Sequence, residues 1–242
     1  MNVTIFTANK PRHNYLIEKI GISATNLFVF REKKRKKIYN KNFLKSYSKK
    51  VLSSEKKFFI NSKIKKKNIK IKNLEYGELN QLDFDKSNIF FKSDLYIVFG
   101  SSIIRNKLLQ YLLKKKAINI HMGISPYYNG TDCNFWALFD NNPHLVGGTL
   151  QYLSPKVDQG NIISVVKSKY RRNIFDYSML SVKLTIDKLS NLIKKKNFFS
   201  QNTIKQNISK NIRTSQSNEF TEEIVKTFFN KKIILKKKKF NI

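Results

Sequence analysis

Two short apolar segments, separated by an amphipathic helical pattern, constrain the fold of this chain most strongly. Residues 94–99 and 117–121 have the length of strands and are mostly apolar, which is typical of strands buried on both faces. Between them, residues 104–115 have helical spacing, with an inner face formed by Leu108, Leu109, Leu112 and Leu113. A strand, a helix and a strand in this order form a right-handed crossover between parallel strands. The sequence therefore predicts an α/β fold with a Rossmann-like, open, mostly parallel sheet flanked by helices.

Similar patterns predict further elements on both sides of this unit. Additional strands are expected at residues 2–7, 27–30, 69–71, 146–153 and 162–167. Additional helices are expected at residues 13–20, 43–59, 134–139, 175–195 and 219–229. The inner stripe of the longest helix comprises Leu180, Leu184, Leu189, Leu192 and Ile193. We expect a main domain over residues 1–200 and a C-terminal appendage, residues 201–242, with a basic tail and one helix capped by Ser217 or Asn218.

Length and composition exclude several classes of protein. At 242 residues the chain fits one large domain, and it has no apolar run of about 18 residues that could form a transmembrane helix. The first six residues read as a strand rather than a signal peptide, so we expect a cytoplasmic protein without membrane insertion. Cys133 is the only cysteine, which excludes an intramolecular disulfide and a multi-cysteine zinc site, and no other ligand cluster indicates a metal.

The chain carries a formal net charge of +32. Such a charge suggests a nucleic-acid partner, because lysines that neutralise phosphates release counterions. However, Lys outnumbers Arg 41 to 7, which is the usage of an AT-rich genome and the wrong bias for bidentate phosphate recognition. Within residues 117–163 the only Lys or Arg is Lys156, against Asp132, Asp140 and Asp158. Nucleic-acid binding therefore stays open but is not favoured, and the positive charge lies mainly outside this segment.

Residues 100–160 contain six of the eight glycines, two of the three histidines and the only tryptophan, which indicates a segment selected for its backbone geometry. At its centre, Asn119 and His121 are two apart, so on a strand both side chains point to the same side. In open parallel sheets, ligands bind at the carboxyl ends of the strands. An amide and an imidazole aimed at one spot can stabilise an oxyanion. The alternative is a structural role, in which Asn119 forms hydrogen bonds to a loop and His121 is hydrogen-bonded in the core.

Asp158 is the third candidate, in a turn that ends at Gly160 before an apolar segment. A carboxylate near His121 would raise the pKa of the imidazole and keep it charged. It could also accept a proton from an attacking amine, directly or through a water molecule. The alternative is an ordinary turn residue, since Asp is common before Gly in turns.

Together these residues resemble the folate-dependent formyltransferases, which move a formyl group from N10-formyltetrahydrofolate to an amine. The motifs are Asn119-x-His121, then Pro126-Tyr127-x-x-Gly130, then Asp158-x-Gly160-x-Ile-Ile, within a region of resemblance over residues 94–163. Fainter similarity covers residues 7–13 and 218–229. The resemblance implies a catalytic trio of Asn119, His121 and Asp158 and no metal. It also implies folate contacts from Phe99, Gly100, Ser101, Ile103, Leu153 and Val157.

The sequence departs from the family pattern at three positions. Met122 stands where many members have Pro, Ser125 where many have Leu, and Gln159 where a small hydroxyl residue is common. None of these removes a catalytic atom, although each weakens the assignment to a subfamily. The segment from Gly123 to Gly130, followed by Asn-Phe-Trp at residues 134–136, most resembles the branch that acts on the amino sugars of nucleotide sugars.

Three acceptor amines compete. Formylation of methionyl-tRNA would need an added C-terminal domain, and too few residues follow the long helix to form one. Binding of glycinamide ribonucleotide would need a glycine-rich phosphate turn after the first strand, and residues 7–13 contain no glycine. For a nucleotide-linked amino sugar, Arg12 could meet the diphosphate, and the ligand could stack on Tyr127, Tyr128 and Trp136, unless these rings pack in the core. Two other functions stay open: hydrolysis of the formyl donor, and nucleic-acid binding by a basic protein with a transferase fold. A homodimer also stays open.

Overall fold

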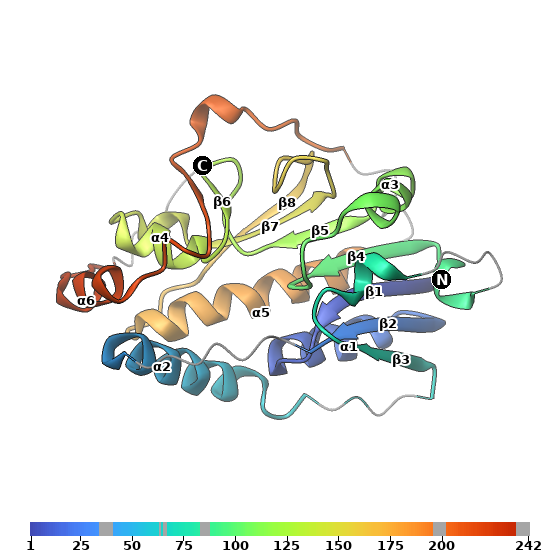
Figure 1. The fold of residues 1–242 in the computed structure, drawn as a ribbon, viewed down its shortest axis with the longest axis horizontal. Coiled ribbons are helices and arrows are strands. Elements are labelled where there is room, and N and C mark those ends of the chain that lie inside the picture. The colour runs from blue at the N-terminus through green and yellow to red at the C-terminus, as the bar shows by residue number, and fades with distance from the viewer. Residues whose placement is uncertain (34–40, 63, 65–66, 83–87, 196–201, 236–242) are drawn as a thin grey trace.

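The computed structural model describes residues 1–33, 41–62, 64, 67–82, 88–195 and 202–235. It confirms the predicted α/β fold, with a seven-stranded, mostly parallel sheet flanked by helices (Figure 1). In sheet order the strands are β3 (Ile69–Leu74), β2 (Asn26–Glu32), β1 (Asn2–Ala8), β4 (Leu95–Phe99), β5 (Ile118–His121), β7 (Gly147–Tyr152) and β8 (Ile162–Lys167). The first five strands in this order are parallel, whereas β7 is antiparallel to both β5 and β8.

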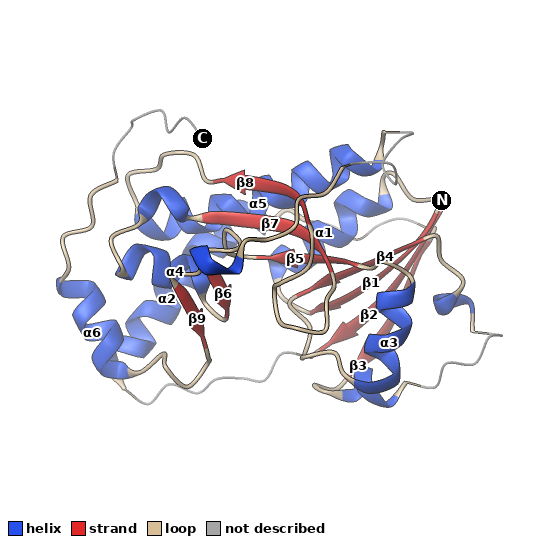
Figure 2. Cartoon of the chain, turned by 90° about the horizontal axis from the view of Figure 1, so that it is seen from above, coloured by secondary structure: helices blue, strands red, loops and turns tan. Residues whose placement is uncertain are grey.

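Helices cover both faces of the sheet, because the buried strands present apolar side chains to both sides (Figure 2). The helices are α1 (Pro11–Gly21), α2 (Asn42–Phe59), α3 (Asn106–Lys114), α4 (Cys133–Phe139), α5 (Ile174–Ile193) and α6 (Glu222–Asn230). Val3 and Ile5 of β1 belong to a core shared with α1 and α5, whereas Phe6 belongs to a second core shared with α3. This alternation follows the two-residue period of a strand.

A third core, rich in aromatic rings, joins α4 to α2 and α6. The rings of Tyr47 from α2 and Phe135 from α4 lie 5.5 Å apart between centroids. Glu222, in the first turn of α6, accepts hydrogen bonds from the backbone N–H groups of Phe43 at 2.8 Å and Leu44 at 3.0 Å. A carboxylate is stabilising at a helix N-terminus, so α6 both packs on α2 and caps it.

The predicted elements are all found, with ends shifted by a few residues. In α5, Leu184 is only half-buried, and Val182 and Ile186 take its place in the core. Two three-residue strands, β6 (Tyr128–Gly130) and β9 (Arg213–Ser215), were not predicted, and they pair in parallel outside the main sheet. Short 3₁₀ helices were also not predicted; these are η1 (Glu78–Gln81), η2 (Ile89–Phe91), η3 (Pro143–Leu145) and η5 (Ile208–Lys210).

The last helix begins three residues later than predicted. The cap is Thr221, not Ser217 or Asn218, because Thr221 has extended backbone and its side chain accepts a hydrogen bond from the N–H of Ile224. Within the described part of the chain, no helix combines the length and apolar character that a membrane span requires.

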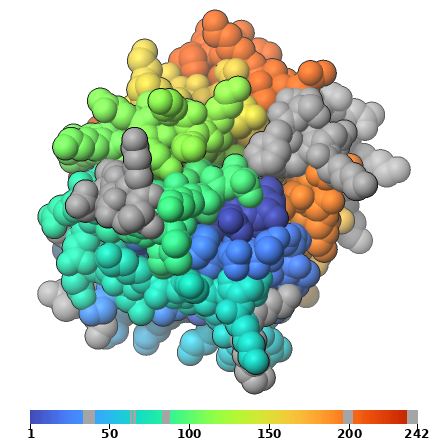
Figure 3. Space-filling view, turned by 90° about the vertical axis from the view of Figure 1, so that its right-hand side faces the viewer, coloured from blue at the N-terminus to red at the C-terminus, as the bar shows by residue number. Residues whose placement is uncertain are grey.

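The C-terminal residues lie against the main sheet. Ile204 forms an antiparallel bridge with Ile162 of β8, and the space-filling view shows this orange segment beside the yellow surface of β7 and β8 (Figure 3). The expected boundary near residue 200 falls within residues 196–201, and the expected basic tail within residues 236–242, both outside the described residues. The division into a main domain and an appendage therefore stays a proposal.

Candidate active site

Strand β5 brings Asn119 and His121 to the same face of the sheet. Their partners across the antiparallel ladder are Gln151 and Thr149 of β7, so four polar side chains project from this face. Ile120, between Asn119 and His121, points the other way into the core shared with α5. A buried strand can therefore carry two functional side chains without opening the core behind it.

Asp158 reaches this face from the turn that follows β7. Its φ of 56° lies in the left-handed region, which Asp tolerates better than most residues, and its side chain is only 8% exposed. Its Oδ1 accepts a hydrogen bond from Asn119 Nδ2 at 3.0 Å. Its Oδ2 lies 3.1 Å from His121 Nδ1 and accepts a hydrogen bond from the Gly130 N–H at 2.9 Å. One carboxylate thus joins all three residues that the sequence singled out.

Both ring nitrogens of His121 face acceptors. Nδ1 faces Asp158, and Nε2 lies 2.8 Å from the backbone oxygen of Tyr128. Only a protonated imidazole carries a donor on each nitrogen. Burial lowers the pKa of His121, but Asp158 and Cys133 together raise it by more, so the pKa lies well above its usual value. The site therefore holds an imidazolium against a carboxylate.

The same contacts act on Asp158 in the opposite direction. Burial raises the pKa of its carboxyl group, whereas the charge of His121 and the hydrogen bonds from His121, Gly130 and Asn119 lower it by more. The carboxylate is therefore ionised throughout the neutral range, which keeps the ion pair intact.

Close packing fixes the imidazole in place. A Cβ at Gly123 would lie 2.5 Å from His121 Nε2 and 2.7 Å from Cβ of Cys133, so only glycine leaves room for the ring. Cys133 is 2% exposed. Among the described residues, no three His, Cys, Asp or Glu side chains are grouped so that they could hold a metal ion.

Comparison with known proteins decides the family. A family model described as formyl transferase matches residues 7–172, which is more than half of the chain. This chain belongs to the formyl transferase family. It is therefore an enzyme that transfers formyl groups, and the matched range includes all three residues of the trio. A search of curated proteins gives no match.

Solved structures of low sequence identity share the fold of this formyl transferase. A 4-N formyltransferase from Francisella tularensis is 18% identical over 93% of this chain and 86% of its own, with a TM-score of 0.55. A phosphoribosylglycinamide formyltransferase from Anaplasma phagocytophilum is 15% identical over 80% and 85%, with a TM-score of 0.54. A sugar N-formyltransferase from Shewanella is 18% identical over 91% and 78%, with a TM-score of 0.50.

The positions expected to contact folate lie at the end of β4 and on the loops after β4 and β7, the two neighbours of β5 in the sheet. Phe99 ends β4, Gly100, Ser101 and Ile103 follow it, and Leu153 and Val157 follow β7. Phe99 and Leu153 pack into the cores, whereas Ile103 and Val157 are 60% and 57% exposed. Gly100 has a φ of 66°, and a Cβ there would lie 2.6 Å from His13 Nε2. These loops therefore offer exposed aliphatic side chains on a closely packed backbone.

Sequence reasoning missed Glu32, which holds the loop after β4 in place. Glu32 ends β2, is 1% exposed, and accepts hydrogen bonds from the Ser102 N–H at 2.6 Å and the Ser102 hydroxyl at 2.8 Å. It also accepts one from the Gly77 N–H at 2.7 Å. The available signal was an acidic residue at the end of this strand, separated from its apolar run by Arg31.

Arg12 is engaged elsewhere than expected. Its Nε lies 3.4 Å from Oε1 of Glu55, which is 1% exposed on α2. A buried carboxylate needs such a partner, so this ion pair joins α1 to α2. The expected contact of Arg12 with a diphosphate is therefore not supported by the geometry.

Two of the three aromatic residues expected to stack on a ligand are buried. Tyr128 is 1% and Trp136 2% exposed, and the guanidinium of Arg213 lies 4.3 Å from the Trp136 ring centroid. Both rings pack in the aromatic core, so the predicted stacking role is wrong for them. Tyr127, which is partly buried at the edge of this core, keeps accessible surface.

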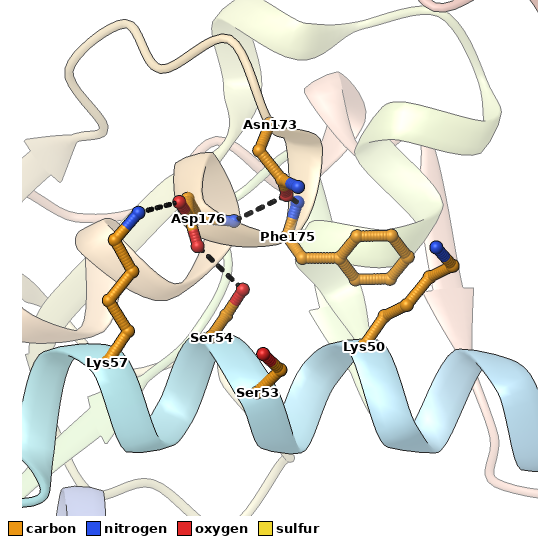
Figure 4. Close-up of a pocket in the computed structure, with 7 residues that line it drawn as sticks. All are labelled: Lys50, Ser53, Ser54, Lys57, Asn173, Phe175 and Asp176. Atoms are coloured by element: carbon orange, nitrogen blue, oxygen red, sulfur yellow. Dashed lines mark hydrogen bonds and ion pairs between the residues drawn. The ribbon is translucent and has the colours of Figure 1, made fainter.

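A pocket of about 320 Å³ lies between α2 and the start of α5 and shares no residue with the trio (Figure 4). Within it, Asp176 accepts hydrogen bonds from Ser54 at 2.7 Å and Lys57 at 2.5 Å. Asn173 caps α5 by accepting from the N–H groups of Phe175 and Asp176. These polar groups form hydrogen bonds with one another or with the backbone of α5, so their role is to join α2 to α5.

Proposed function

We propose that this enzyme transfers a formyl group from N10-formyltetrahydrofolate to a primary amine of a nucleotide-linked amino sugar. The observation that carries the proposal is the direct contact of Asn119, His121 and Asp158 through one buried carboxylate. The family supplies the reaction class. The sugar acceptor is supported by the sequence of residues 123–136, and solved structures described as 4-N and sugar N-formyltransferases share the fold.

The formyl donor fits the loops that flank β5. Exposed Ile103 and Val157 supply apolar surface for a flat ring system, and Glu32 fixes the backbone of the loop that carries Ile103. The donor supplies the formyl carbon and leaves as the amine of tetrahydrofolate. The residues of this chain position that carbon beside the trio.

Each residue of the trio has a distinct role. The amide of Asn119 carries two N–H donors, of which Asp158 accepts one, so the second is available to the formyl oxygen. His121 supplies positive charge next to the oxygen on which negative charge develops. Asp158 keeps His121 protonated and assists transfer of the proton lost by the attacking amine, directly or through a water molecule, to the tetrahydrofolate nitrogen, which leaves as an amine.

The N–H of His121 at Nε2 is already used. It donates to the backbone oxygen of Tyr128, so the formyl oxygen must compete with this carbonyl for the hydrogen bond. A negatively charged oxygen accepts hydrogen bonds more strongly than a neutral carbonyl. The exchange therefore favours the transition state over the bound substrate, which is the condition for catalysis.

The test offers N10-formyltetrahydrofolate with nucleotide-linked amino sugars, glycinamide ribonucleotide or methionyl-tRNA, and follows which acceptor gains a formyl group. We expect formylation of an amino-sugar nucleotide. Transfer to another acceptor would replace the proposed substrate, and formate release that no acceptor stimulates would indicate a hydrolase. Binding of nucleic acid that shows no selectivity and disappears at high salt would reflect charge alone.

Replacing Glu32 with glutamine is expected to raise KM for the formyl donor several-fold with a smaller change in kcat. Glutamine presents an NH₂ group to a backbone N–H, which costs roughly 2 kcal/mol of stability and loosens the loop at Ser102. Glu75→Gln is the matched control, since Glu75 is 61% exposed and pairs with Lys33 on the surface. Equal KM values in the two variants would remove this loop from the donor site.

A further inference from the structure

Gln206 connects the C-terminal segment to the turn that carries Asp158. Its side chain is buried, at 8% exposure. Its Nε2 donates hydrogen bonds to the backbone oxygen of Asp158 at 2.9 Å, to that of Gly160 at 2.7 Å and to Oε1 of Gln151 at 2.9 Å. An amide nitrogen has two N–H groups for these three acceptors, so its donor capacity is fully used.

The backbone around Gln206 is itself fixed. Two residues earlier, Ile204 exchanges both backbone hydrogen bonds with Ile162, at 2.8 and 2.9 Å. Five residues later, the side chain of Asn211 donates to the backbone oxygen of Pro126 at 2.9 Å. The backbone that carries Gln206 is thus held on both sides of this residue.

The turn needs such a donor. Asp158 adopts a left-handed φ of 56°, and the carbonyl groups of Asp158 and Gly160 point to one shared position. A Cβ at Gly160 would lie 1.8 Å from the Tyr152 oxygen, so the turn is packed tightly against β7. Buried carbonyls without a donor are costly, and a strained φ persists only where the surroundings enforce it.

We propose that Gln206 is a positioning residue for formyl transfer, which holds the turn so that the carboxylate of Asp158 stays in contact with Asn119 and His121. This inference rests on the proposed function of the trio. The side chain of Gln206 contacts the backbone oxygen of Asp158. Gln206 therefore acts through the position of Asp158 and not on the substrate. Removing its N–H groups takes the donor away from the carbonyls of Asp158 and Gly160, and the turn relaxes to satisfy them.

The test compares Gln206→Met with Gln216→Met. Methionine has nearly the length and volume of glutamine but no N–H, and Gln216 is an exposed residue of the same C-terminal region. We expect Gln206→Met to lower kcat about tenfold with KM changed less than twofold, and Gln216→Met to leave both unchanged.

The decisive readout is the protonation of His121. The chain has three histidines, so imidazole ¹⁵N spectra are simple, and the His121→Gln variant assigns the signal. We expect the signal of the charged ring to convert to neutral at lower pH in Gln206→Met than in the wild-type protein, and the alkaline limb of the kcat profile to move with it. A folded variant whose scaffold alone is weakened would leave both unchanged.

The outcomes separate this inference from the proposed function. Unchanged titration and kcat in a folded Gln206→Met variant would overturn the positioning role even if the wild-type enzyme transfers formyl groups. If the wild-type enzyme formylates none of the acceptors, the proposed function fails, and the titration still decides whether Gln206 controls the ion pair. If Gln206→Met fails to fold, Gln206→Asn replaces it, because this shorter amide can reach only one carbonyl. We expect a smaller shift of the His121 titration in the same direction, and no shift would count against the proposal.

Discussion

Replacing Asp158 with asparagine is expected to lower kcat for formyl transfer by up to about 10⁴-fold, the loss seen when the carboxylate that orients a catalytic imidazole is neutralised. Oδ2 of Asp158 faces two N–H donors, His121 Nδ1 and the Gly130 amide, while Oδ1 accepts from Asn119. Asparagine has one oxygen and cannot satisfy both sides. Without the carboxylate, the pKa of His121 falls, because burial still lowers it and its main charged partner is lost.

Asp132→Asn is the matched control for this prediction. Asp132 has the same left-handed backbone, with a φ of 54°, and its side chain makes no cap hydrogen bond to α4. Asparagine tolerates this region as well as Asp does, so neither change strains the backbone. Steady-state rates of both variants, measured well below the unfolding temperature of each, would isolate the charge of Asp158. Activity of Asp158→Asn within a few-fold of the wild-type enzyme would remove it from the trio.

Replacing His121 with glutamine is expected to lower kcat roughly 10²- to 10³-fold, the usual effect of losing one group that stabilises a developing oxyanion. It should also change how stability depends on pH. The raised pKa of His121 adds stability that is complete below pH 6.5 and is lost as the pH rises through the raised pKa. The lowered pKa of Asp158 adds stability that is complete above pH 3.8 and is lost as the pH falls through the lowered pKa.

Thermal unfolding between pH 4 and 9 checks this second prediction. The wild-type Tm should decline above pH 6.5 as the ion pair is lost, and the His121→Gln variant should lack that decline. His144→Gln provides a control at a partly buried histidine of η3, outside the trio. A double-mutant cycle with Asp158→Asn measures the coupling. Additive losses in kcat would show that the two residues act independently.

Much of the site followed from local spacing. Asn119 and His121 could be placed on one face because a strand repeats every two residues, and the apolar runs around them identified a buried strand. Asp158 was singled out through its turn and through resemblance to a family. Its contact with His121 depends on how the β7–β8 connection folds back, which no local pattern encodes.

The surroundings of several predicted site residues come from distant segments. Trp136 is buried because α6 and β9 cover α4, and Arg12 pairs with Glu55 because α2 places this carboxylate beside it. Burial of one aromatic ring among many cannot be read from its own sequence neighbours. Strands of three residues, such as β6 and β9, are too short to show any period.

The direction of β7 has a consequence for engineering. Because β7 runs against β5, the chain leaves the sheet beside Ile118 and must double back through residues 153–161 to deliver Asp158. The length of this connection therefore sets the position of Asp158, and adding or deleting one residue there would misplace the carboxylate. Loop grafts that aim to change the acceptor should leave it untouched and vary segments that do not set this distance.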